Sequence, residues 1–345
     1  MTAWHILAFL GGLTIVAATV MSAVRTIVMP HGRSANLTRF LFVTVRGVLS
    51  VHRFLPGSDG SHHELQSLYA PLALVMLPLV WITTALSGFT MIFWSLGIDD
   101  VTTAFKYAGS AMLTIGFADT DQLSLLIASF AAAGLTISLF ALLLVTYLPT
   151  MYQAYSARET ALAALETFAG EPADPVDLII RHHRIGALDR LDQLWTEWQR
   201  HFFEMRETHT ALPAVALFRS PTPERHWVRS AEALLDAAAL WNAVCITDED
   251  PEASLCIRAG ALALADIARF FRIEIPHTYT KGDPISIDRA QFDELIARLS
   301  GAGVQLVPDL DEAWADWAGW RVNYDLSVIA LSNVTSAPAT DRYAR

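Results

Sequence analysis

Residues 114–119, Thr114-Ile115-Gly116-Phe117-Ala118-Asp119, form the stretch that decides the fold of this chain. Two long charge-free runs flank it, residues 65–98 before it and residues 122–157 after it. An apolar run of about 20 residues is long enough to cross a bilayer as a helix. The pattern therefore predicts one span outward, a middle segment that dips into the membrane and returns, and a second span back.

The composition separates a membrane part from a soluble part. The chain has 345 residues, 53% of them hydrophobic and 17% charged, with a mean hydropathy of +0.36. The basic and acidic residues up to Thr150 cancel, so the whole formal net charge of -11 lies in the remainder. Such an acidic surface excludes nucleic acid as a partner, because phosphate contacts need basic residues. We expect an apolar membrane domain followed by an acidic soluble domain.

The first segment, residues 1–30, contains an apolar run from residue 3 to residue 24 that ends at Arg25. Its length suits a transmembrane helix. The alternative is a cleaved signal peptide, but no basic residue precedes the run and the charge follows it instead. We therefore interpret it as a retained helix.

Residues 31–66 carry Arg33, Arg39, Arg46 and Arg53 and no acidic residue before Asp59. Arginines at near-helical intervals with apolar residues between them are typical of an amphipathic helix on a membrane surface. A cytoplasmic loop with helical character is the other interpretation. Short loops rich in Arg and Lys stay on the cytoplasmic side, so both interpretations place the N-terminus outside and the C-terminal domain in the cytoplasm.

Residues 67–151 form the predicted pore domain, with an outer helix, a pore helix and filter at 101–119, and an inner helix. The segment 101–113 is too short and too mixed to cross a bilayer, and Asp99 or Asp100 is placed to cap a short helix there. Irregular backbone at membrane depth is tolerated only where protein buries it or where it lines a wet pathway. A short helix, a turn at Gly116 and an acidic exit at Asp119 therefore predict an ion pathway.

The hexapeptide resembles the selectivity filter of the potassium-channel pore-domain family, whose pattern is T-[VI]-G-[YF]-G-D, and matches it at five of six places. In that family an outer helix, a pore helix, a filter loop and an inner helix are repeated four times around one axis. Rings of backbone carbonyls replace the hydration shell of the ion. The resemblance covers about residues 68–151, and it implies a channel in the inner cell membrane with permeant K+ and no cofactor.

Carried over by residue, the resemblance implies that the carbonyl oxygens of Thr114, Ile115, Gly116 and Phe117 bind successive K+ ions. The Thr114 hydroxyl would add an inner ligand. Asp119 would support the filter from behind or stand at its mouth. Glycine is needed where the backbone takes a positive φ, and Gly116 meets that need once.

Two positions depart from the family pattern. Ala118, the last residue of the predicted filter, stands where a second glycine is expected, and Leu113 replaces the usual threonine before the filter. A Cβ at positive φ costs on the order of 1 kcal/mol or more, so both departures weaken the inference of strict potassium selectivity. Potassium transporters of a related type keep a single glycine but join four such units in one chain. This chain has one unit, so we expect a homotetramer with a fourfold axis.

Two residues of the predicted inner helix allow different interpretations. Gly134 follows three alanines, and small residues permit close helix packing. The functional alternative is a hinge about which the inner helix bends to gate the pore. Pro149, near the inner end, is interpreted as a helix terminator.

Residues 152–345 are predicted to form a mostly α-helical cytoplasmic domain for regulation or assembly. Periodicity and prolines place helices at 153–169, 175–210, 223–247, 252–272, 288–300 and 310–323. Residues 273–287 are a candidate hairpin, and Asp288 with Gln291 marks a helix start. The tryptophans at helical spacing favour core or subunit interface. His182 and His183 are either a pH sensor or part of a solvated helix face.

The motifs leave two functional hypotheses. The first is a tetrameric cation channel, selective for potassium, whose cytoplasmic domain regulates or assembles it. The second is a membrane-anchored receptor or scaffold with a weakly selective or non-conducting pore, whose soluble domain binds an unknown ligand or protein. An enzyme is not expected, since no nucleophile–base set is evident, and the Cys and His spacing matches no zinc site. Cys245 and Cys256 are interpreted as a reduced, buried pair.

Overall fold

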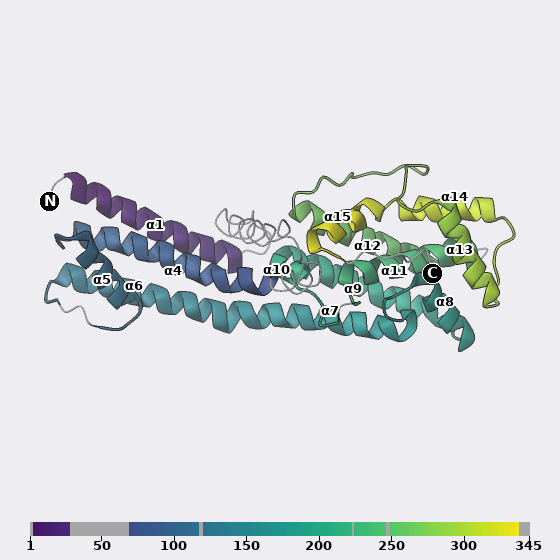
Figure 1. Ribbon diagram of the computed structural model, residues 1–345, viewed down its shortest axis with the longest axis horizontal. Helices are drawn as coiled ribbons and strands as arrows, with labels where there is room; N and C mark the ends of the chain where they lie inside the picture. The colour runs from purple at the N-terminus through teal and green to yellow at the C-terminus, as the bar shows by residue number, and fades with distance from the viewer. Residues whose placement is uncertain (1–2, 28–68, 117–119, 223, 246–248, 338–345) are drawn as a thin grey trace, which may run out of the picture. The chain divides into compact units, whose positions relative to one another are not determined.

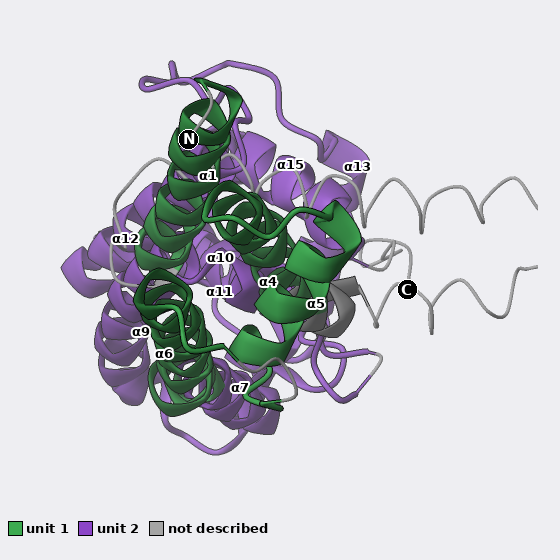
Figure 2. Ribbon diagram, turned by 90° about the vertical axis from the view of Figure 1, so that its left-hand side faces the viewer, with its two compact units in different colours: residues 1–153 green, residues 154–345 purple. Residues whose placement is uncertain are grey.

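The computed structural model describes residues 3–27, 69–116, 120–222, 224–245 and 249–337 (Figure 1). Within these ranges all regular structure is helical and no strand occurs. The chain divides into two compact units, Met1–Gln153 and Ala154–Arg345 (Figure 2). The predicted basic segment 31–66 lies outside the described residues.

Unit 1 consists of long apolar helices and one short helix. They are α1 (Ala3–Ile27), α4 (Tyr69–Ser95), α5 (Val101–Met112), α6 (Leu123–Ala141), a π-helical segment (Leu142–Tyr147) and the start of α7 (Leu148–Ala169). Three stretches are long and apolar enough to cross a membrane, namely Ala3–Thr26, Met76–Ser95 and Leu123–Ala169. Their length and composition indicate a membrane protein.

α1 packs along α4 through a close glycine contact (Figure 1). A Cβ on Gly12 would lie 2.5 Å from the Gly88 carbonyl oxygen, and a Cβ on Gly88 would lie 3.0 Å from the Gly12 carbonyl oxygen. Small residues let two helix backbones approach in this way. The buried Trp81 indole Nε1 donates a hydrogen bond to the Ser22 hydroxyl at 3.3 Å. The first apolar helix is therefore an integral part of unit 1.

The centre of unit 1 is formed by α4, α5 and α6. The buried face of α5 carries small residues, Ala104 and Ala108, followed by Met112. They pack in one cluster with Phe93 of α4 and Ala132 of α6. The small side chains let the short helix lie close to both long ones, which fixes the end of α5 beside α6.

Pro149 does not end the inner helix, and the prediction that it does is wrong. The helix continues from Leu123 to Ala169, so the predicted helix 153–169 is its last part. Proline removes a donor and its ring clashes with the carbonyl four residues earlier, which here is that of Val145. The π-helical segment Leu142–Tyr147 lies at that place, and the Leu148 N–H donates to the Leu143 carbonyl. The wider turn accommodates the ring without breaking the helix.

Unit 2 contains the rest of α7 and a set of shorter helices. They are α8 (Pro175–Arg184), a 3₁₀ turn (Leu188–Arg190), α9 (Leu191–Ala211), α10 (Pro213–Leu217), α11 (Trp227–Leu240), a π-helical segment (Trp241–Cys245), α12 (Pro251–Phe270), α13 (Arg289–Gly301), α14 (Leu310–Arg321) and α15 (Asp325–Thr335). The predicted start of α13 is confirmed, since Asp288 and Gln291 form a capping box. A mostly helical second half is confirmed for the described residues.

Three local predictions for unit 2 are wrong. The expected helix 175–210 is broken after α8, where Gly186 takes a φ of 66° and its N–H bonds to the His183 carbonyl. The candidate hairpin at 273–287 has no strand. It follows α12, and Arg272, two residues beyond the end of that helix, takes a φ of 62°. Helix α15 was not predicted, because residues 325–335 mix apolar and small polar residues without a clear period.

Buried aromatic residues form the core of unit 2. Trp195, Trp198, Trp227 and Trp317 are all buried in one cluster, which confirms their predicted place in a core. His182 is also buried and stacks on Phe168 with ring centroids 4.6 Å apart, so a solvated helix face is wrong for this histidine. Burial lowers its pKa.

The two cysteines of unit 2 are free. Burial raises the pKa of Cys245 to about 12 and raises that of the fully buried Cys256 as well. Thiols with raised pKa values remain protonated and unreactive. The interpretation of a reduced pair therefore agrees with the structure.

A buried arginine joins three helices of unit 2. Arg321 of α14 is 1% exposed, and its guanidinium lies 2.9 Å from Glu232, 2.5 Å from Asp236 and 2.9 Å from Asp325. The hydroxyl of Tyr324 also donates to Asp236, at 2.8 Å. These contacts tie α11, α14 and α15 together, so the network determines how the last third of unit 2 packs.

Two histidines of unit 2 are buried near arginines. Burial, followed by the charges of Arg158, Arg219 and Arg229, lowers the pKa of His226 to about 3. His209 is fully buried, and burial together with Arg158 lowers its pKa well below the usual value. Both imidazoles are therefore neutral at pH 7, and protonating either would place a charge in the core.

We expect Arg321→Met to destabilise unit 2 by about 3–5 kcal/mol, because three buried carboxylates would lose their common cation. Arg289→Met is the matched control, since Arg289 makes its ion pairs at the exposed surface of α13. Denaturant unfolding of the full chain in detergent, followed by tryptophan fluorescence, measures the difference. Equal midpoints for the two variants would contradict the role of the network.

We expect acid to weaken unit 2. His226 and His209 have pKa values below the unfolded value of about 6.5, so the unfolded chain binds more protons below that pH. The free energy of unfolding then falls by about 1.4 kcal/mol per pH unit per histidine as the pH decreases from 6.5 toward 3.

The measurement is the unfolding free energy between pH 7.5 and 5. His226→Gln should make the unfolding free energy less dependent on pH, because the contribution of one buried histidine is removed. His277→Gln, at an exposed position, should leave this pH dependence unchanged. A slope that His226→Gln does not alter would show that this histidine does not couple to folding.

Candidate functional site

Helix α5 begins at a well-formed cap. The Asp100 carboxylate accepts the Thr103 backbone N–H at 2.9 Å and the Thr103 hydroxyl at 3.1 Å. The backbone bond and then the hydroxyl bond lower the pKa of Asp100, so the cap is charged at neutral pH. The prediction that Asp99 or Asp100 caps this helix is confirmed for Asp100. The charge also suits the positive end of the helix dipole.

The hexapeptide begins where α5 ends. The Thr114 N–H bonds to the Ala111 carbonyl at 3.1 Å, and the Ile115 N–H bonds to the Ser110 carbonyl at 3.0 Å. This pair of bonds is a Schellman motif, in which one residue is left-handed. That residue is Thr114, with a φ of 56°. A β-branched residue in this conformation costs on the order of 1–2 kcal/mol, which the two backbone bonds help to offset.

The backbone alternates in hand from Leu113 to Gly116. Leu113 has a φ of -83°, Thr114 is left-handed, Ile115 is not, and Gly116 has a φ of 77°. Successive carbonyl groups would otherwise point in opposite directions. Reversing the sign of φ at every second residue rotates the peptide planes so that these carbonyls can face the same way. A Cβ on Gly116 would meet no atom within 4 Å, so the glycine is required by its conformation and not by crowding.

The loop returns to the end of α4 from which it started. The Gln122 side-chain amide donates to the Leu96 carbonyl at 3.2 Å, and the Gln122 N–H bonds to the Thr120 hydroxyl at 3.2 Å. Leu96 directly follows α4, and Gln122 directly precedes α6. The segment between the two long helices therefore begins and ends at the same end of the pair.

Of the predicted filter, the structure places Thr114, Ile115 and Gly116 in sequence after α5. Phe117, Ala118 and Asp119 lie outside the described residues. The Thr114 hydroxyl donates to the Leu113 carbonyl at 2.7 Å, and Ile115 is 60% exposed. The described half of the hexapeptide thus lies at the surface of the single chain.

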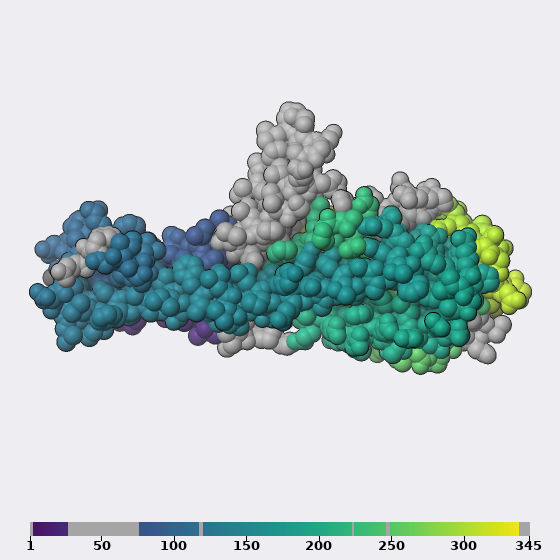
Figure 3. Space-filling view, turned by 90° about the horizontal axis from the view of Figure 1, so that it is seen from below, coloured from purple at the N-terminus to yellow at the C-terminus, as the bar shows by residue number. Residues whose placement is uncertain are grey.

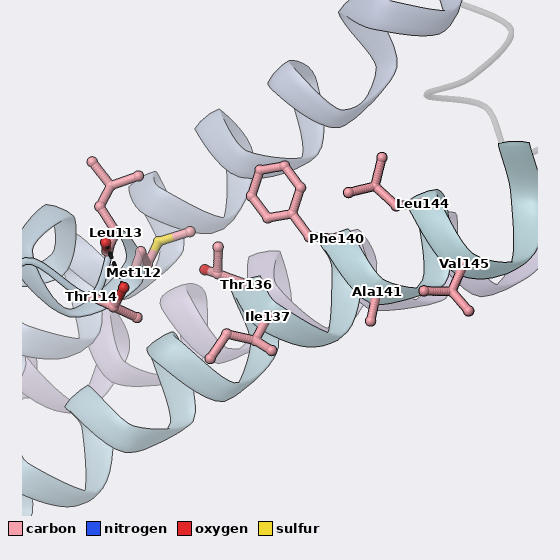
Figure 4. Close-up of a pocket in the computed structure, with 9 residues that line it drawn as sticks. All are labelled: Met112, Leu113, Thr114, Thr136, Ile137, Phe140, Ala141, Leu144 and Val145. Carbon is pink, nitrogen blue, oxygen red and sulfur yellow. Dashed lines mark hydrogen bonds between the residues drawn. The ribbon is translucent and has the colours of Figure 1, made fainter.

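An apolar groove of about 390 Å³ lies between the end of α5 and α6 (Figure 4). Its lining residues are Met112, Leu113, Thr114, Thr136, Ile137, Phe140, Ala141, Leu144 and Val145. The Thr136 hydroxyl is occupied by a bond to the Ala132 carbonyl at 3.0 Å, so it adds little polarity. The groove places Thr114 above one face of α6 and its π-helical continuation.

Gly134 was interpreted as a site of close helix packing, with a hinge as the alternative. The helix is regular there, and a Cβ on Gly134 would meet no atom of the described residues within 4 Å, so no described part of this chain packs closely against it. The departure from α-helical geometry lies at Leu142–Tyr147, which the sequence analysis missed. Pro149 could have indicated this departure from α-helical geometry, because a proline within a continuing apolar run predicts a distortion of the helix one turn earlier.

The surface of α6 is apolar beyond its contacts with α4 and α5. Leu123, Ile127, Phe130 and Ile137 are all exposed, and Phe130 is 76% exposed. Figure 3 views the protein from the side on which α6 lies. An apolar surface of this kind suits contact with lipid or with another protein. Among the described residues no group of His, Cys, Asp and Glu could hold a metal ion.

Comparison with models of protein families, with curated proteins and with solved structures gives no match for this chain.

Proposed function

We propose that the chain assembles as a homotetramer that conducts monovalent cations selectively for potassium. The observation that carries the proposal is the return of the α5 segment to the end of α4, closed by the bond between Gln122 and Leu96. If α4 and α6 cross the bilayer, this segment enters and leaves it on one side. Re-entrant backbone of that kind is stable only when it is buried or lines a wet pathway.

The ion sites in this proposal are backbone carbonyls. The alternation of hand from Leu113 to Gly116 supports it, because a filter needs successive carbonyls to face one axis. Thr114, Ile115, Gly116 and Phe117 contribute these carbonyls, Ala118 completes the filter and Asp119 supports it. Each copy supplies one carbonyl per level, so four copies close each ring.

The proposed location is the inner cell membrane, with the N-terminus outside and unit 2 in the cytoplasm. The arginines at residues 31–66 and the near absence of basic residues between the later spans support this orientation. The acidic surplus of unit 2 would then raise the local cation concentration at the inner mouth. Unit 2 serves assembly or regulation.

The alternative is a receptor or scaffold whose pore conducts weakly or not at all. Ala118 favours it, because the second glycine of the filter pattern is missing. In that case unit 2 would carry the function by binding an unidentified cytoplasmic ligand or protein. Ion flux distinguishes the two functions.

In vesicles, we expect the reconstituted chain to pass K+ and to exclude Na+. Gly116→Val should lower K+ flux at least tenfold, since a Cβ is disfavoured at a φ of 77° and would disturb the carbonyl rings. Gly97→Ala is the matched control, because Gly97 also has a positive φ (113°) and open space around it but lies in the turn before α5.

The rate of K+ uptake into the vesicles is measured and compared with the rate of Na+ uptake under an equal concentration gradient. Equal losses in Gly116→Val and Gly97→Ala would assign the effect to strain alone. An intact tetramer that passes no cation would favour the receptor or scaffold.

Restoring the missing glycine tests selectivity. We expect Ala118→Gly to raise the K+ to Na+ permeability ratio several-fold, because glycine would remove the steric penalty of a Cβ where the filter pattern has its second glycine. Reversal potentials in paired K+ and Na+ solutions measure the ratio. An unchanged ratio would mean that the backbone accepts alanine at this turn.

A further inference from the structure

We propose that Lys106 of α5 forms an ion pair with an acidic residue, Asp99 or Asp121, of a second copy of this chain. The inference rests on the proposed tetramer and adds a specific contact between its subunits. Lys106 is the only Lys or Arg between Arg53 and Arg158. One positive charge within such a long apolar region calls for a structural explanation.

Lys106 lies on the face of α5 that its own chain leaves uncovered. At 3.6 residues per turn Lys106 lies opposite the buried Ala104 and Ala108, and the exposed Val101 and Phe105 lie between these two sides. Lys106 is exposed and makes no ion pair or hydrogen bond with a described residue, although its charge acts on Asp100 of its own chain. The uncovered surface of α5 therefore carries both large apolar side chains and one cation.

Lipid is a poor partner for this face. A lysine at membrane depth is energetically unfavourable unless it reaches the interface or an anion. Lys106 lies about 9 Å along the helix from the Asp100 cap at 1.5 Å per residue. In a ring of four copies, a short helix with one face on its own α4 and α6 turns the other face toward the next copy. Protein can supply both the apolar contact and the anion there.

Apart from Asp100, the carboxylates that the structure describes at that end of unit 1 are Asp99 and Asp121. Asp100 is already used, because it caps α5 through Thr103. Asp99 precedes that cap, and Asp121 adjoins Gln122, whose side chain bonds to Leu96. Both aspartates are exposed and make no hydrogen bond or ion pair with a described residue. A flexible lysine stem can extend toward them. The Lys106 ammonium group of one copy can therefore pair with the carboxylate of Asp99 or Asp121 of another copy.

Charge exchange in the full-length chain tests the pair. Lys106→Glu should reduce the fraction of tetramer that survives heating in mild detergent at least tenfold. Combining it with Asp99→Lys or with Asp121→Lys should restore most of that fraction for one of the two acids. Thr83→Glu, an exposed change on α4, controls for adding a negative charge to a membrane helix.

Thiol cross-linking provides an independent measurement. Lys106→Cys combined with Asp99→Cys or Asp121→Cys should give products of two to four copies with a short bis-maleimide, whereas the unsubstituted chain should not, since its cysteines are largely buried. Cross-links confined to one copy, with no rescue by either exchange, would overturn the proposal. So would tetramer survival that depends on anionic lipid and not on either aspartate, which would assign Lys106 to headgroups.

The two proposals fail in distinguishable ways. Cross-links between copies together with charge rescue, but without ion flux, would support the pair and refute conduction. A chain that stays monomeric in membranes would overturn both. Flux that persists while Lys106→Glu leaves tetramer survival unchanged would refute the pair and leave the channel intact.

Discussion

Backbone polar groups inside a bilayer must find partners within the protein, and in the proposed channel this constraint governs the segment between α4 and α6. Its first part meets the constraint as α5, with Asp100 at one end and the bonds of Thr114 and Ile115 at the other. Its last part is held by Gln122 against the Leu96 carbonyl.

The same constraint explains the path of the inner helix. A proline within a spanning helix frees one carbonyl, and the chain resolves this with a π-helical turn at Leu142–Tyr147 ahead of Pro149. The apolar groove below Thr114 extends along this part of the helix. A change in the wider turn would therefore alter the wall beneath the proposed filter, which makes this segment a better site for bending than Gly134.

Local signals in the sequence predicted the elements whose partners are close in the chain. Asp100 before α5 and Asp288 with Gln291 before α13 are examples, because a cap needs only three or four consecutive residues. The Arg321 network could not be predicted, since its carboxylates on α11 are more than eighty positions away. The π-helical turn was missed because Pro149 was taken as an end instead of a distortion.

The candidate site was predictable in its residues but not in its geometry. The motif singled out Thr114, Ile115 and Gly116, and two of these residues, Thr114 and Gly116, take a positive φ in the structure. Nothing in the sequence indicated that Thr114 would take a left-handed conformation in addition to Gly116.

That conformation is strained for threonine, and strain of this kind persists only where surrounding contacts hold it. In one chain the contacts are two hydrogen bonds to the end of α5. A carbonyl site for K+ needs several oxygens at once, and in the proposed channel one chain would supply a single carbonyl at each level. The proposed ion site would thus belong to the assembly, whereas the strained turn is already held within one chain.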